Sequence, residues 1–322
     1  MAVYVNTNYS ALQGQRYLGN VQNQLTTTYQ RLSSGMRINS AKDDAAGLQI
    51  ADRLTSQING LNQGNRNASD GIALAQTMEA GMDEISGMLQ KIRTLTVQAA
   101  NGTNTMEDRK SLGKEIASLA TEVNRIAQQT TFAGKTILNG KTKTGSIYGD
   151  DATIQGNALA GGAGAMTLQV GSNKGDTITF TANSVMFSSL GAANANLVKE
   201  DGSKFFHTTT TGEVKVAVDK LDYSDSTKDE YVGNVIDYVD AMIAKIDGYR
   251  ADLGAVQNRL ESSIRNQSNV AANEADARSR IRDADFAEES ANLSQQSIIQ
   301  QAAASMLMQA NTRPQLGLSL LG

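Results

Sequence analysis

The sequence predicts a mainly α-helical protein, a long antiparallel coiled-coil helical bundle with a small β-hairpin excursion. Three observations support this fold class. Two flanks, about 1–133 and 231–322, are rich in Gln, Asn and Ala. Apolar residues recur in them at spacings of three and four, the pattern of a coiled-coil seam. The segment between the flanks is instead rich in Gly, Thr and Ser, and parts of it alternate apolar with polar residues as strands do.

The first seam predicts one long helix over about 45–100. It is broken only by Asn65, and it consists of Leu54, Ile58, Leu61, Ala68, Ile72, Ala75, Met78, Met82, Ile85, Leu89 and Ile92. At 1.5 Å per residue such a helix is about 84 Å long. A compact globule of this chain length would be only roughly 50 Å across, from its expected radius of gyration. We therefore expect a rod.

Two further seams complete the bundle. The second consists of Leu112, Ile116, Leu119, Val123 and Ile126, and the third of Val235, Val239, Met242, Ile246, Tyr249, Leu253, Val256 and Leu260. The third lies beyond the centre of the chain and must return antiparallel to the first.

Local signals mark where these helices begin and end. Ser40 with Asp43, and Thr105 with Asp108, have the spacing of a capping box. Asn101-Gly102 is a stop signal. In the centre, Met166–Val170 and Thr177–Thr181 alternate around a Gly-containing turn, which predicts a hairpin at about 166–181, and Val214–Val218 alternates likewise.

Composition excludes several classes of protein. The chain has no Cys, one His and a net charge of -4. This excludes a disulfide scaffold and a site with two His ligands, and it argues against nucleic acid as a partner. No apolar stretch approaches the roughly 20 residues that span a bilayer. We expect no cofactor, no metal, no membrane insertion and no enzyme activity. Of the acidic pairs Asp43-Asp44 and Asp283/Asp285, Asp43 is explained more simply as a helix cap, and a catalytic carboxylate needs a cleft that a solvated rod lacks.

The two ends of the chain carry the functional signal. Residues 1–36 contain no Asp or Glu, and residues 290–322 contain one charged side chain, Arg313. The apolar positions proposed to form an assembly core are Leu12, Leu18, Val21, Leu25, Leu32, Leu293, Ile299, Met306, Leu316, Leu318, Leu320 and Leu321. Uncharged amphipathic helices suit burial against copies of themselves. The ends either pair inside a monomer or, as we prefer, are poorly ordered alone and pack on assembly into an open helical filament.

The residues also carry a family resemblance. The segments Arg31-Leu-Ser-Ser-Gly-Met-Arg-Ile-Asn-Ser-Ala-Lys-Asp-Asp-Ala-Ala-Gly47 and Ala277-Arg-Ser-Arg-Ile-Arg-Asp-Ala-Asp-Phe286 resemble bacterial flagellin. So do Arg66–Ile72, Gln309–Pro314 and Leu318–Leu321. The resemblance implies terminal helices at 1–40 and 286–322 in the filament core and a helical bundle at 41–140 and 231–285. It also implies a short variable, surface-facing segment at 141–230.

The resemblance further implies a flagellar filament subunit for swimming motility, located outside the cell. Flagellins are exported unfolded by the flagellar type III apparatus without a cleaved signal peptide, and their partners include hook–filament junction proteins, a cap protein and an export chaperone. A patch read by Toll-like receptor 5 corresponds here to Lys91, Arg93, Leu95, Gln98 and Glu115. Recognising flagellins usually have Arg at the position of Lys91, and Lys cannot reproduce a bidentate guanidinium contact. A junction protein, or an immune-active ligand that works as a monomer, remains the alternative.

Overall fold

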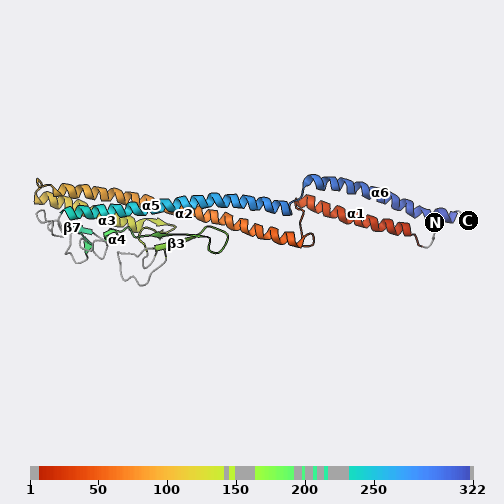
Figure 1. The fold of residues 1–322 in the computed structure, drawn as a ribbon, viewed down its shortest axis with the longest axis horizontal. Helices are drawn as coiled ribbons and strands as arrows, with labels where there is room; N and C mark the ends of the chain where they lie inside the picture. The colour runs from red at the N-terminus through yellow and green to blue at the C-terminus, as the bar shows by residue number, and fades with distance from the viewer. Residues whose placement is uncertain are drawn as a thin grey trace. The chain divides into compact units, whose positions relative to one another are not determined.

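The structure is a computed structural model that describes residues 7–140, 145–148, 164–191, 198–199, 206–208, 214–216 and 232–319. Its helices are α1 (Tyr9–Ser34), α2 (Ala45–Ala100), α3 (Met106–Gln129), α4 (Phe187–Gly191), α5 (Val232–Arg282) and α6 (Phe286–Ser319). Its strands are β1 (Thr131–Phe132), β2 (Lys135–Thr136), β3 (Gly164–Gln169), β4 (Thr177–Ala182), β5 (Val198–Lys199), β6 (Phe206–Thr208) and β7 (Val214–Val216). The predicted mainly helical class with a small hairpin is confirmed (Figure 1).

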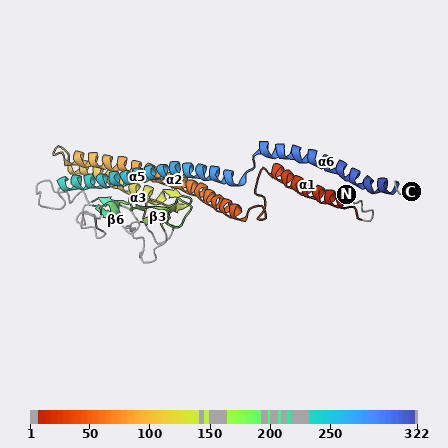
Figure 2. The same cartoon turned by 45° about the vertical axis from the view of Figure 1, so that its right-hand side comes forward.

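The chain divides into two compact units, and each draws on both halves of the sequence. One unit contains residues 1–59 and 269–322, and the other contains residues 60–268. In the first unit α1 and α6 lie side by side, as Figures 1 and 2 both show. They run antiparallel, since Asn8 near the start of α1 contacts Ala310 while Arg31 near its end contacts Glu289.

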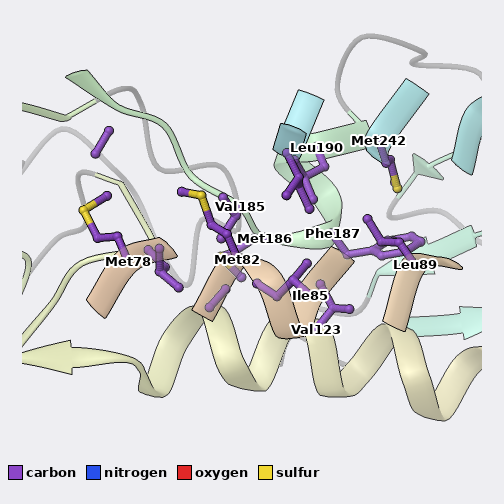
Figure 3. Packing of buried hydrophobic residues seen from close by; sticks show 14 of the residues in the cluster. Met78, Met82, Ile85, Leu89, Val123, Val185, Met186, Phe187, Leu190 and Met242 are labelled. Carbon is purple, nitrogen blue, oxygen red and sulfur yellow. The ribbon is translucent and has the colours of Figure 1, made fainter. Parts of the chain in front are cut away.

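The second unit holds the main hydrophobic core. The predicted seams supply it: Met78, Met82, Ile85, Leu89 and Ile92 of α2 are at most 1% exposed. Val123 from α3 and Met242 from α5 join them, and the segment Val185–Leu190 covers the cluster (Figure 3). Because three helices and this segment all contribute, the core fixes the register of the bundle.

The start of α2 differs from the sequence prediction. Asp43 accepts hydrogen bonds from the backbone N–H groups of Asn39 and Ser40 and from the Ser40 hydroxyl, so these residues form a turn before the helix. The helix cap is Asp44, whose carboxylate accepts from the Gly47 N–H at 2.9 Å. Thr105 and Asp108, in contrast, form the predicted capping box of α3, and α2 ends at Ala100, directly before the predicted stop.

The hairpin of β3 and β4 packs against α2. Its strands pair antiparallel from Gly164 with Ala182 to Gln169 with Thr177. A Cβ added at Gly64 of α2 would lie 2.0 Å from the Val170 carbonyl oxygen. The hairpin therefore approaches the helix more closely than any side chain at this position permits. The expected strand at Val214–Val218 is present as β7, with positions 217 and 218 outside the described residues.

Candidate functional site

The structure brings the two predicted sets of apolar residues onto one helix pair. Val21 is buried, while Leu18, Leu25, Leu32, Leu293 and Ile299 are half-buried along the contact between α1 and α6. Leu12 and Met306 stay 52% and 68% exposed. Leu316 and Leu318 fall within α6, and Leu320 and Leu321 lie outside the described residues. The pairing that the sequence left as one of two alternatives is thus present within a single chain.

Polar contacts fix the register of this helix pair. Thr28 is 4% exposed and donates its hydroxyl to Gln296 at 3.2 Å. The Asn8 side chain donates to the Ala310 carbonyl at 2.8 Å. Arg31 Nη1 lies 3.1 Å from a carboxylate oxygen of Glu289, whose side chain is only 9% exposed. A partly buried ion pair of this kind contributes more to register than to net stability, because desolvation offsets its attraction.

Much of the apolar surface of the pair remains exposed to solvent. The large hydrophobic side chains that are more than half exposed in this unit are Tyr9, Leu12, Tyr17, Tyr29, Phe286, Ile298, Met306 and Met308. A groove of about 800 Å³ between the helices is lined by Gly14, Tyr17, Ile299, Ala303 and Met306, among others. Exposed apolar surface on this scale is typical of a protein interaction site. We refer to these eight side chains and the groove as the terminal apolar surface.

Sequence reasoning missed the aromatic members of this surface. It followed Leu and Val at helical spacing, and Tyr9, Tyr17 and Tyr29 lie off that stripe. The absence of acidic residues from 1–36 could have identified them, since aromatic side chains are enriched and charges are depleted at the centres of interfaces.

The second predicted set of residues lies in the other unit. Lys91 Nζ is 3.0 Å from Glu115, and both side chains are about half exposed. Arg93 binds Asp240 of α5 through two nitrogen atoms, at 2.5 and 3.1 Å. This contact raises the pKa of Arg93 above its usual range. Leu95 is 7% exposed and belongs to the core. The structure therefore brings Lys91 and Glu115 together, leaves Gln98 exposed and buries Leu95.

Neither set has the geometry of a reaction centre. Among the described residues no group of three or more His, Asp or Glu side chains could hold a metal ion. Within the same residues no helix is long and apolar enough to cross a membrane. Burial raises the pKa of the Tyr148 hydroxyl. This hydroxyl donates a hydrogen bond to the Ile137 carbonyl at 2.7 Å, so its role is structural.

Comparison with known proteins assigns the chain to a family. Residues 5–143 match the bacterial flagellin N-terminal helical region, and residues 236–321 match the bacterial flagellin C-terminal helical region. Flagellin D of Vibrio anguillarum is 38% identical over the full length of both chains, and polar flagellin C of Vibrio parahaemolyticus is 36% identical over the same span. A flagellar hook-associated protein of Vibrio parahaemolyticus shares the fold, with a TM-score of 0.53 and 16% identity over 75% of this chain and all of that one. Two family regions at opposite ends and full-length identity above one third lead to one conclusion: this chain belongs to the bacterial flagellin family.

Proposed function

We propose that the terminal apolar surface of α1 and α6 is the contact through which this subunit joins its neighbours. Flagellins are structural proteins, not enzymes, and they self-assemble into the extracellular flagellar filament. The observation that supports the location of the contact is the exposure of eight large hydrophobic side chains on one helix pair. Burying them in a neighbouring copy would stabilise the filament by about 25 cal/mol per Å², offset by the cost of ordering the helices.

The proposal includes the division of the chain along the filament radius. Residues 1–40 and 286–322 would form the core of the filament, residues 41–140 and 231–285 a surrounding helical shell, and residues 141–230 the outer surface. The low charge of both ends supports this order, because a charged side chain in the core would have to lose its hydration. Export of the unfolded chain by the flagellar type III apparatus, with an export chaperone, and contact with junction and cap proteins belong to the same proposal.

A charge placed on the terminal apolar surface tests the assembly contact. Met306→Asp alters a side chain that is 68% exposed, so the free subunit should fold as before, while burial of the new carboxylate in a neighbour should block polymerisation. Leu25→Asp, which places a charge in the half-buried contact between α1 and α6, should also block polymerisation. The measurement is seeded sedimentation, with the pellets examined by electron microscopy.

The matched control is Met106→Asp. Met106 is 50% exposed at the first position of α3, where an acidic residue is favourable to the helix dipole. This variant should polymerise like the parent chain. Normal filaments from Met306→Asp and Leu25→Asp would show that the contact lies elsewhere. A parent chain that stays soluble under all seeding conditions would favour the junction or monomeric-ligand role.

Recognition by Toll-like receptor 5 is a second proposed function. The side chains of Lys91, Arg93 and Glu115 favour it, since they are exposed and carry both signs of charge. Lys91 pairs with Glu115 of α3, and Arg93 pairs with Asp240 of α5. The test measures receptor binding by assembly-blocked subunits, with and without the substitutions Arg93→Ala and Asp240→Ala. Both variants should weaken binding if the receptor uses the guanidinium in its present orientation, and unchanged binding by both would remove the patch from consideration.

A further inference from the structure

The turn between α2 and α3 contains an Asn-Gly sequence in an exposed and uncrowded position. We propose that Asn101 is a site of spontaneous deamidation, in which the Gly102 backbone nitrogen displaces the side-chain amide. This modification requires only water as co-reactant, and the inference is independent of the assembly contact proposed above.

The geometry of the turn favours the reaction. Asn101 and Gly102 are both exposed, and nothing lies within 4 Å of a Cβ built at Gly102. The Thr103 N–H donates to Asn101 Oδ1 at 3.4 Å. A bond of this kind closes an Asx turn, which holds the side-chain carbonyl carbon near the intervening peptide nitrogen. Within the described part of the chain, the Gly102 N–H makes no hydrogen bond that would have to break first.

The chemistry balances without an enzyme. Gly102 N loses its proton and attacks Asn101 Cγ, so that a bond forms between these atoms and closes a five-membered ring. The bond from Cγ to Nδ2 breaks, and the amide nitrogen takes up one proton, which balances the one lost by Gly102 N, and leaves as ammonia. Water then opens the ring at either carbonyl carbon and yields aspartate or isoaspartate. The enforced proximity of nucleophile and carbonyl replaces a bimolecular encounter, which is why the turn geometry matters.

The chain contains two other Asn-Gly sequences, and the structure protects both. Asn59-Gly60 lies inside α2, where the Gly60 N–H belongs to the helical hydrogen-bond ladder. Helical backbone angles also hold the Asn59 side chain away from the nitrogen that follows it. At Asn139-Gly140 the asparagine is half-buried and the glycine is buried. One of three identical dipeptides is therefore free to react.

Deamidation would change the turn in two ways. Aspartate adds a negative charge at the C-terminal end of α2, where the helix dipole is unfavourable to it. Isoaspartate adds a carbon atom to the backbone path and disturbs two bonds that close the turn. These run from the Asn104 N–H to the Asn101 carbonyl at 3.2 Å and from the Asn104 side chain to the Gln98 carbonyl at 2.6 Å. Both products should loosen the junction of α2 with α3.

The test incubates the full chain at mildly alkaline pH in water enriched in oxygen-18 and then digests it with trypsin. Residues 94–109 form one peptide, which carries Asn101 and Asn104, and residues 54–66 form another, which carries Asn59. We expect Asn101 to exchange its amide for a labelled carboxylate at least about fivefold faster than Asn59, Asn104 or Asn139, since the folded backbone protects the others. In denaturant the rates of Asn59 and Asn101 should converge.

The control variant is Gly102→Ala. The position has open space and no left-handed backbone angle, so the variant should keep the fold while hindering the attacking nitrogen and slowing the reaction several-fold. The proposal is overturned if Asn59 or Asn139 reacts as fast as Asn101 in the folded chain. It is equally overturned if Gly102→Ala leaves the rate unchanged.

Discussion

The ion pair between Arg31 and Glu289 shows how single residues specify the contact of α1 with α6. Replacing Arg31 with Met should destabilise the helix pair by about 2 to 3 kcal/mol, because it leaves a carboxylate buried without its partner. The double variant Arg31→Met with Glu289→Gln should recover part of this loss, since a neutral amide costs less to bury unpaired. Hydrogen exchange at the amides of α1 and α6 measures both effects. A double variant no more stable than the single one would contradict this account.

The capping box of α3 makes a pH-dependent prediction. Hydrogen bonds from the side chain and then the backbone of Thr105 hold the pKa of Asp108 below its ordinary value of 3.8. A lowered pKa means that the contribution of Asp108 to stability is present above that ordinary value and is lost as the pH falls through the folded-state pKa. The start of α3 should therefore fray in acid.

Thr105→Val tests the cause of this shift. The variant removes the largest of these hydrogen bonds, so the pKa of Asp108 should rise toward 3.8 in a carbon-detected NMR titration. Asp43 provides the internal reference, because its lowered pKa arises from bonds to Ser40 and Asn39. A parallel change at Asp43 would mean that the substitution acts through the whole fold.

At the scale of elements, two glycines of α2 distinguish the effect of side-chain packing from the effect of helix propensity. Gly64→Ala should destabilise the second unit by about 1 to 3 kcal/mol, since the new methyl group would overlap the Val170 carbonyl and push the hairpin away. Gly87→Ala in the same helix should instead stabilise it by about 1 kcal/mol, because its added methyl meets open space and Ala favours the helix. Thermal unfolding followed by circular dichroism compares the two. Equal effects of the two substitutions would mean that the hairpin does not pack closely against Gly64.

The elements most faithful to the sequence are those fixed by periodicity. The seam from Leu54 to Ile92 predicted the extent of α2, and the alternation of apolar with polar residues predicted β3 and β4. Both predictions succeed because the burial of one face of a helix or strand produces a regular spacing of apolar residues in the sequence. The cap of α2 was misplaced at Ser40 with Asp43, since Asp43 and Asp44 are adjacent and only the course of the backbone decides which one faces the helix end.

Features that depend on two distant segments escaped prediction. The Asp240 partner of Arg93 required the register of α5 against α2, and the role of Gly64 required the docked position of the hairpin. The exposed Tyr17 and Tyr29 could not be recognised as a surface until the pairing of α1 with α6 showed which helix faces remain uncovered. Local sequence carries none of this information.

For the whole molecule, the proposed assembly contact predicts a change in order on polymerisation. Amides of α1 and α6 should exchange faster in the free subunit than those of the second unit, since a single helix pair has a small core. In filaments they should become strongly protected. Equal protection in both states would mean that the helix pair is already fully stable alone.

A truncated chain lacking residues 1–40 and 286–322 tests the same idea in the opposite direction. The seams of α2, α3 and α5 remain complete in it, so it should stay folded and soluble and should not join seeded filaments. Sedimentation and circular dichroism together distinguish this outcome from misfolding. Co-sedimentation of the truncated chain with seeds would place an assembly contact within the bundle.

The two helices of the first unit are synthesised far apart in time, since α1 precedes α6 by most of the chain. Arg31 and Glu289 are separated by 258 positions, so α1 has no native partner while the intervening residues are being translated. At about 5 to 20 residues per second, that wait lasts roughly 13 to 50 s. During it the amphipathic N-terminal segment cannot form its native helix pair with α6. The order of synthesis thus delays formation of the paired terminal helices until α6 has left the ribosome.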